Sequence, residues 1–165
     1  METSVRKATA RDYSSLCDLL DEVDALHRDK LPGIFQRPSA ASRGKESYLE
    51  LITNEDAALL VAEAAEELVG FVQAIVRDAP TSPIFVPRRY AIVESIGVRS
   101  AFKNHGTGRM LMDKVQEWSI AKGATSIELN VYEFNEAAIS FYERLGYLTL
   151  SRKMTKELRD GRVTG

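Results

Sequence analysis

Hydrophobic residues follow two different periods along this chain, and the changes from one period to the other predict its elements. β-rich runs, some of them alternating with polar residues, predict strands, whereas apolar residues spaced three or four apart predict helices. Strands are expected at 4–8, 57–64, 68–76, 92–98, 126–131 and 147–154, and helices at 10–27, at 48–52, from 110 onwards and at 136–145. The predicted order is therefore β-α-α-β-β-β-α-β-α-β.

Local signals support individual boundaries. Thr9 and Asp12 form the Thr-x-x-Asp pattern of a capping box before the first helix. Residues 65–67 separate two strand runs and predict a hairpin, and Gly70 in its second strand predicts a bulge or a close approach. The connection 77–89 contains three prolines, and connections of that length are commonly functional or mobile.

Composition narrows the class of protein. The chain has 165 residues, of which 44% are hydrophobic and 28% charged, and its net charge is −2. This balance is typical of one soluble domain, expected to span 1–155 before a charged tail at 156–165, and it argues against a nucleic-acid partner. The single cysteine, Cys17, excludes an internal disulfide framework and a cysteine-rich zinc site, so no metal is expected. Because no apolar run has the length of a membrane span or a signal peptide, we expect a cytoplasmic protein with no membrane partner.

A glycine-containing turn, Lys103-Asn104-His105-Gly106-Thr107-Gly108-Arg109, follows the fourth strand and precedes a helix. Glycines let backbone N–H groups turn inward, and the start of the helix attracts an anion, so a phosphorylated cofactor is expected here. The turn fails the Walker A pattern, because Gly106 and Gly108 are separated by one residue and followed by Arg109. It also fails the dinucleotide fingerprint, because Leu111 stands where the third glycine is required. Since a tight connection can have the same glycines, the turn alone leaves both interpretations open.

This turn resembles the Arg/Gln-x-x-Gly-x-Gly/Ala pattern of the GNAT superfamily of N-acetyltransferases, with Lys103 in place of the usual Arg or Gln. A second signature of the superfamily, Asn-x-x-Ala-x-x-Phe-Tyr-x-x-x-Gly-Phe/Tyr, resembles Asn135-Glu136-Ala137-Ala138-Ile139-Ser140-Phe141-Tyr142-Glu143-Arg144-Leu145-Gly146-Tyr147. An amphipathic helix with a glycine stop would account for this second segment by itself. Because both patterns occur in the expected order on the expected elements, the chain is identified by resemblance as a member of this superfamily.

The resemblance implies an α/β fold of the mixed α+β kind, in which helices cover both faces of a mixed sheet that is splayed between strands four and five. It also implies acetyl-CoA as the cosubstrate, with its pantetheine arm in the splay and its pyrophosphate in the turn. Gly97 is expected to leave room for the arm. Asn135 would contact the cofactor, although it also suits a helix N-cap. The expected cofactor-binding residues are Ile96, Gly97, Val98, Lys103, Asn104, His105, Gly106, Thr107, Gly108, Arg109, Asn135 and Tyr142.

Acetyl transfer from a thioester to an amine needs a base for the amine and a proton for the departing thiolate. Tyr142 matches the family position that commonly donates this proton, and a phenol with a pKa of about 10 suits a thiolate. A core aromatic residue is the alternative for Tyr142. Glu94 alternates with Ile92, Ile96 and Val98, so we expect it to share their face of the strand. The family often places a base there, acting directly or through water; a strand carboxylate paired with Lys or Arg is the alternative.

The expected function is an N-acetyltransferase that moves the acetyl group of acetyl-CoA to a primary amine of a small molecule, peptide or protein by direct attack. A CoA-binding regulatory or sensor domain without turnover is the alternative. Acidic residues within 21–29 would favour a cationic amine, although a solvated helix face has the same composition. Apolar residues at 34–35 and 84–86 predict either a lid over the acceptor or a homodimer contact.

Overall fold

The computed structural model describes residues 2–38 and 44–158, and the chain divides into two compact units, Met1–Asn130 and Val131–Gly165. The first unit holds most of the elements, and the second holds the helix α4 (Glu136–Arg144). The predicted order is confirmed as far as α4, with boundaries that differ by a few residues. The elements of the first unit are β1 (Thr3–Lys7), η1 (Ala10–Asp12), α1 (Tyr13–Lys30), α2 (Lys45–Thr53), β2 (Ala57–Ala64), β3 (Glu67–Asp78), β4 (Arg89–Val98), η3 (Ser100–Phe102), α3 (Thr107–Ala121) and β5 (Ile127–Leu129).

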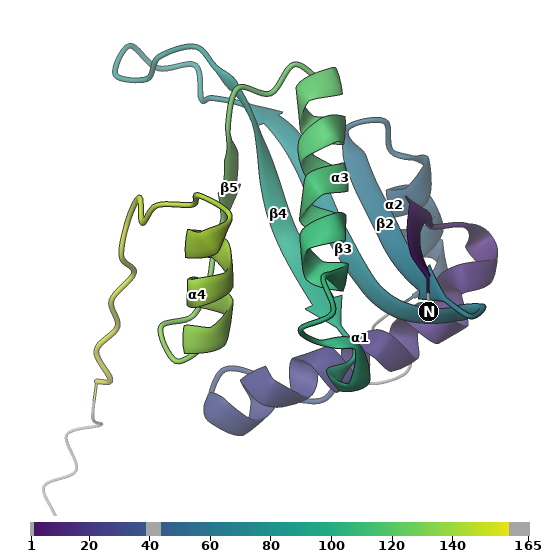
Figure 1. The fold of residues 1–165 in the computed structure, drawn as a ribbon. Coiled ribbons are helices and arrows are strands. Elements are labelled where there is room, and N and C mark those ends of the chain that lie inside the picture. The colour runs from purple at the N-terminus through teal and green to yellow at the C-terminus, as the bar shows by residue number, and fades with distance from the viewer. Residues whose placement is uncertain (1, 39–43, 159–165) are drawn as a thin grey trace, which may run out of the picture. The chain divides into compact units, whose positions relative to one another are not determined.

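The five strands form one mixed sheet in the order β1-β2-β3-β4-β5 (Figure 1). Neighbours from β1 to β4 are antiparallel, whereas β5 runs parallel to β4. β5 pairs with β4 only at Ala91–Val93, so within the described residues β4 has no β5 partner from Glu94 onwards. This arrangement matches the splay implied by the resemblance, and it leaves one edge of β4 without ladder hydrogen bonds near its C-terminal end.

Helices cover both faces of the sheet, as expected (Figure 1). On one face, the core joins Leu16 and Leu19 of α1 and Tyr48 of α2 to apolar residues of β2 and β3, among them the buried Phe71. The neighbouring residue Gly70 faces α3 on the other side, where a Cβ would lie 3.1 Å from Leu111 Cδ1. The register of β2 with β3 also shifts beside Gly70, so both predictions for this glycine are confirmed. No helix in the described part of the chain is long and apolar enough to cross a bilayer.

A bulge interrupts the pairing of β3 with β4 at Glu94. The residues on either side of Glu94 pair with consecutive positions, 74 and 73, of β3, so Glu94 is the extra residue. Ile92 and Ile96 pair with positions 75 and 72, which are three residues apart and therefore on opposite faces of β3. The expectation that Glu94 shares one face with Ile92, Ile96 and Val98 is therefore wrong, because the bulge shifts the alternation by one residue.

Ala65 and Glu66 form a two-residue turn between β2 and β3, which confirms the predicted hairpin. Their φ angles are both positive, at 49° and 64°. Positive φ at both central positions is the requirement of a type I′ turn, which Asn and Gly usually occupy. Two residues with ordinary side chains therefore adopt a backbone conformation that is unfavourable for them.

The second unit confirms the predicted glycine stop of α4 but not the strand expected after it. Gly146 has a φ of 91°, its N–H donates to the carbonyl of Glu143 at 3.0 Å, and the N–H of Tyr147 donates to the carbonyl of Tyr142 at 3.0 Å, which is a Schellman motif. The strand predicted at 147–154 is absent among the described residues. Leu148 is 91% exposed and Leu150 is 80% exposed. Their alternation is typical of a strand, but a strand also requires a neighbour that supplies ladder hydrogen bonds.

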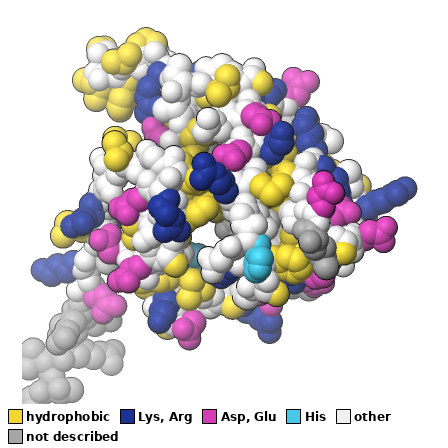
Figure 2. Space-filling view, in the orientation of Figure 1, with side chains coloured by type: hydrophobic (Ala, Val, Ile, Leu, Met, Phe, Trp, Pro, Cys, Tyr) yellow, Lys and Arg dark blue, Asp and Glu magenta, His cyan; other side chains and the backbone are white. Residues whose placement is uncertain are grey.

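The connection between β3 and β4 projects as a finger, residues 79–88 (Figure 1). The N–H of Ala79 donates to the carbonyl of Arg88 at 2.8 Å and closes its base. Ile84 is 82% exposed and Val86 is 76% exposed, and Phe85 lies between them. Hydrophobic side chains accordingly gather on the surface of this projection (Figure 2). The finger therefore presents an apolar tip that the described residues do not cover.

Candidate functional site

The predicted phosphate turn leads into the N-terminus of α3. Asn104 and Gly106 both have positive φ angles, 65° and 84°. A Cβ on Gly106 would have no atom within 4 Å, so its backbone conformation, and not packing, calls for glycine. The first helical hydrogen bond runs from the N–H of Met110 to the carbonyl of Gly106 at 3.0 Å. The N–H groups of residues 107–109 therefore precede the helical ladder and have no helical acceptor.

Thr107, the first residue of α3, packs toward the sheet, where a Cβ on Gly70 would lie 3.4 Å from its Cγ2. The residue is 1% exposed, and its Oγ1 atom is buried without a hydrogen-bond partner among the described residues. Burying a hydroxyl without a partner costs free energy, so such a group needs an explanation. The N–H groups of residues 107–109, at the positive end of the helix dipole, form a donor set for an anion. The residues present therefore fit the pyrophosphate of a coenzyme.

The charged side chains of the turn lie at the surface. Lys103 is exposed and forms no ion pair with a described residue. Arg109 is exposed too, and its Nε lies 3.9 Å from Asp113 Oδ2. His105 Nδ1 lies 2.7 Å from the carbonyl oxygen of Lys103, which braces the turn. Of the two cationic side chains Lys103 and Arg109, Lys103 is thus the one whose charge no described carboxylate balances.

Ile96, Gly97 and Val98 lie in the half of β4 that has no β5 partner. Gly97 was expected to leave room for a cofactor. This expectation is wrong for the face of β4 toward which a side chain at position 97 would point. A Cβ there would lie 2.4 Å from Val23 Cγ2 of α1 and 2.9 Å from Phe71 Cε1. The space is already filled, so this glycine allows α1 to pack closely on β4.

Glu94, the bulged residue of β4, has an exposed side chain. Its Oε2 accepts a hydrogen bond from Gln73 Nε2 at 2.7 Å. Among the described residues no Lys or Arg pairs with this carboxylate, and its hydrogen-bond partner is a neutral amide. A carboxylate that is held by one neutral donor and remains open to water can accept a proton from a bound amine.

A link between α1 and the end of β4 was not anticipated from the sequence. Glu22 of α1 accepts a hydrogen bond from the N–H of Ser100 at 2.8 Å and pairs with Arg99 Nη1 at 3.1 Å. The Ser100 hydrogen bond, helped by Arg99, lowers the pKa of Glu22. Arg99 also donates from Nε to the carbonyl of Leu68 at 2.9 Å. This link spans 77 residues of sequence between Glu22 and Arg99, and no local signal reveals it.

The second unit holds the two residues predicted from the second signature. Asn135 caps α4, since its Oδ1 accepts a hydrogen bond from the N–H of Ala138 at 3.2 Å. Tyr142 is buried, and its ring contacts those of Phe141 and Tyr147 at centroid distances of 5.3 Å and 5.8 Å. Burial, with a smaller contribution from Tyr147, raises the pKa of Tyr142 to about 12. The phenol thus stays protonated at neutral pH but is a weaker acid than an unperturbed tyrosine.

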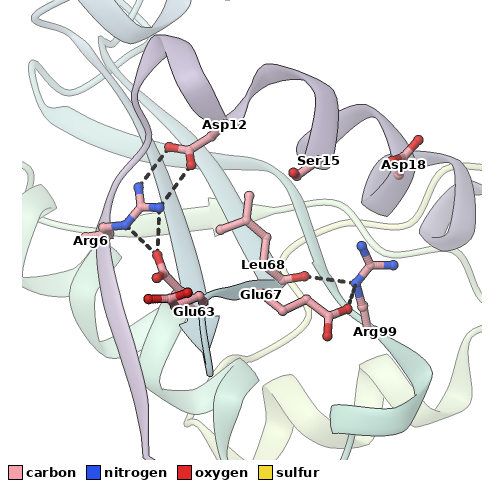
Figure 3. Close-up of a pocket in the computed structure, with 9 residues that line it drawn as sticks. Arg6, Asp12, Ser15, Asp18, Glu63, Glu67, Leu68 and Arg99 are labelled. Carbon is pink, nitrogen blue, oxygen red and sulfur yellow. Dashed lines mark hydrogen bonds and ion pairs between the residues drawn. The ribbon is translucent and has the colours of Figure 1, made fainter.

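A polar pocket of about 260 Å³ lies against β1, the start of α1 and the β2–β3 hairpin (Figure 3). Arg6 donates to both carboxylate oxygens of Asp12, at 2.8 Å and 2.9 Å, and to Glu63 at 2.8 Å. The Arg6 hydrogen bond lowers the pKa of Asp12 to about 2. The N–H of Thr9 donates to Asp12 at 2.7 Å, which confirms the capping box. These groups satisfy one another, and the described residues contain no cluster able to hold a metal ion.

Comparisons with known proteins agree with this arrangement. A family model described as the acetyltransferase (GNAT) family matches residues 20–147. YhfO, an uncharacterized N-acetyltransferase of Bacillus subtilis (strain 168), is 25% identical over 145 residues, which are 87% of this chain and 89% of that protein. A mutant form of the BH1408 protein from Bacillus halodurans has a TM-score of 0.88 at 24% identity, and the match covers 94% of this chain and 99% of the BH1408 chain. The aminoglycoside N-acetyltransferase AAC(6')-Iy in complex with CoA has a TM-score of 0.73 at 19% identity and covers 96% of each chain. At these identities, the two solved structures show likeness of fold alone.

Proposed function

Because the chain belongs to the acetyltransferase (GNAT) family, we propose that it is an acetyl-CoA-dependent N-acetyltransferase that acts on a primary amine of a small molecule, peptide or protein. The observation that carries this proposal is the start of α3, where Gly106 has a φ of 84° and the N–H groups of 107–109 have no helical acceptor. The likeness in fold to an acetyltransferase in complex with CoA supports the same cosubstrate.

Acetyl-CoA supplies the acetyl group as a thioester, and the chain supplies binding and proton transfer. The donors at 107–109 and the main-chain groups at 96–98 would hold the pyrophosphate and the pantetheine arm, respectively. Glu94, oriented by Gln73, would take a proton from the attacking amine, directly or through a water. Tyr142 would give its proton to the departing thiolate, and its pKa of about 12 ensures that the proton is present at neutral pH.

A thermal-shift experiment tests the cofactor part of the proposal. Acetyl-CoA should raise the Tm of the protein, and ATP and NAD should raise it much less. Gly106→Val should abolish the acetyl-CoA shift, because a β-branched residue cannot adopt a φ of 84° without strain. Gly123→Val is the matched control, since Gly123 follows the other end of α3 with a φ of 78°. This control should lower the Tm but keep the acetyl-CoA shift; equal shifts with all three ligands would refute the assignment.

Turnover separates the enzyme from a CoA-binding domain that is catalytically silent. Release of free thiol from acetyl-CoA should depend on an added amine and should appear with some members of a panel of amino acids, polyamines and peptides. A full acetyl-CoA thermal shift without thiol release from any amine would support the regulatory or sensor alternative. The presence of Tyr142 and of the exposed Glu94 carboxylate favours the enzyme.

A further inference from the structure

The C-terminal turns of α1 lie near the unpaired edge of β4. Leu16 and Leu19 pack over β2 and β3, and Val23 packs against Gly97 of β4, so α1 crosses the sheet toward that edge (Figure 1). Arg28 comes five residues after Val23, which is about 8 Å further along a helix. Arg28 is therefore placed beyond β4, on the side where the pantetheine arm is proposed to bind.

Arg28 shares a carboxylate with a second arginine. Its Nη2 donates to the carbonyl of Asp21 at 3.1 Å and lies 3.2 Å from Asp21 Oδ1. Arg37, in the segment that follows α1, reaches Asp21 Oδ2 with its Nη2 at 2.6 Å. The two guanidinium groups differ in burial, because the Arg28 side chain is 18% exposed and that of Arg37 is 74% exposed. One carboxylate thus faces two cations. Arg37 contacts both oxygens of Asp21, whereas the more buried Arg28 contacts Oδ1.

The other terminal nitrogen of Arg28 has no acceptor. Nη1 is buried and forms no hydrogen bond with any described residue. A guanidinium nitrogen carries two N–H bonds, and a buried charged donor without an acceptor is more unfavourable than a neutral one. Native proteins contain few such groups, and those that occur commonly belong to a functional site. An anionic acceptor would satisfy Nη1.

We propose that Arg28 selects amines that also carry a carboxylate, of which amino acids are the simplest, and this inference rests on the proposed acetyltransferase function. The carboxylate of the acceptor would take a hydrogen bond from Nη1, which would hold the amine at the edge of β4. Because Nη1 is buried, an acceptor can reach it only if neighbouring side chains move, and the exposed pair between Arg37 and Asp21 is a weak contact. Two of the acidic side chains of α1, Asp21 and Glu22, are already paired with arginines.

The test compares each acceptor with an analogue that lacks only the negative charge. A panel of amino acids is assayed beside the corresponding primary amides and decarboxylated amines, for example phenylalanine, phenylalaninamide and 2-phenylethylamine. The wild-type kcat/KM should be higher for the free carboxylates by about 10-fold or more, the effect of one charge-assisted hydrogen bond. Arg28→Gln should remove this preference and leave the KM of acetyl-CoA unchanged, whereas Arg28→Lys should keep part of the preference.

Arg37→Gln is the matched control, because it removes a cation from the same carboxylate but leaves the buried nitrogen of Arg28 in place. It should preserve the preference. Equal wild-type rates for acids and amides, or a preference that survives in Arg28→Gln, would overturn the inference while the enzyme activity stands. Absence of acetylation with every amine would overturn the proposed function and this inference with it. If Arg28→Gln does not fold, the wild-type comparison and Arg28→Lys decide the matter.

Discussion

Replacing Gly97 with alanine tests how α1 is held on the sheet. The new Cβ would lie 2.4 Å from Val23 Cγ2 and 2.9 Å from Phe71 Cε1, whereas carbon atoms in contact sit about 3.5 to 4.0 Å apart. Since Phe71 is fully buried in the core, α1 would have to move outward by about 1 Å. Overpacking of this kind costs about 1 to 3 kcal/mol, and we expect the upper end because the second neighbour cannot move. For a chain of this size, 3 kcal/mol lowers the Tm by roughly 6 to 12 °C.

Urea unfolding of a double-mutant cycle measures this clash. Val23→Ala removes both methyl groups that Gly97→Ala would meet, and alone it should cost at most about 1.5 kcal/mol, because Val23 is only partly buried. The double variant should be more stable than the sum of the single effects predicts, by at least about 1 kcal/mol. Without a clash, Gly97→Ala would instead stabilise the protein by about 0.4 to 1 kcal/mol through the unfolded state. Additive effects, or a stable Gly97→Ala protein that has lost only acetyl-CoA affinity, would refute the packing argument.

Four further predictions concern single side chains. Tyr142→Phe should lower kcat by roughly 10- to 1,000-fold with little change in acetyl-CoA affinity, and unchanged turnover would make Tyr142 a core aromatic residue. The pKa of Tyr142 is about 12, so a pH-dependent change of the wild-type rate that occurs below about pH 10 does not come from this phenol and should also occur in the variant. Glu94→Gln should change the profile of kcat/KM against pH, and an unaltered profile would exclude Glu94 as the base. Asp12→Asn should lower the free energy of unfolding at pH 7 by about 1 to 2 kcal/mol, allowing for solvent around Arg6. The pKa of Asp12 drops from 3.8 to about 2 on folding. The difference in stability between wild type and variant should therefore be complete above pH 3.8 and should disappear as the pH falls to about 2, which stability measurements at acidic pH would check. Phe85→Ser should raise the KM of the acceptor or weaken a dimer in sedimentation, without effect on acetyl-CoA, and no change in any of these would show that the apolar tip has neither role.

Local sequence signals predicted the parts of the site that depend on neighbouring residues. The glycine spacing around Gly106 located a turn with positive φ before α3, and Thr9 with Asp12 located a capping box. Gly146 located the end of α4. In each case, the residues that decide the conformation lie within a few positions of one another, so the pattern contains the physical cause.

Features that depend on distant partners were not predictable in the same way. Nothing between residues 92 and 98 marks Glu94 as the bulged residue, because the pairing with β3 decides which residue is extra. Gly97 does mark a close approach, but the group that approaches on its Cβ side is α1 and not the expected cofactor. The strand expected at 147–154 depends on a neighbour that its own alternation cannot encode. The unpaired nitrogen of Arg28 became visible only when its surroundings were known.

The hairpin turn at Ala65 and Glu66 bears on how readily this protein could acquire new specificities. The positive φ angles there disfavour both side chains, and Ala65→Asn with Glu66→Gly would match the backbone that the turn already adopts. Relief of this kind is commonly worth about 0.5 to 2 kcal/mol. Substitutions that change substrate preference usually destabilise a fold, and most proteins tolerate few of them. A relaxed turn would thus widen the set of acceptor-site variants that still fold, which makes it a sensible starting point for directed evolution.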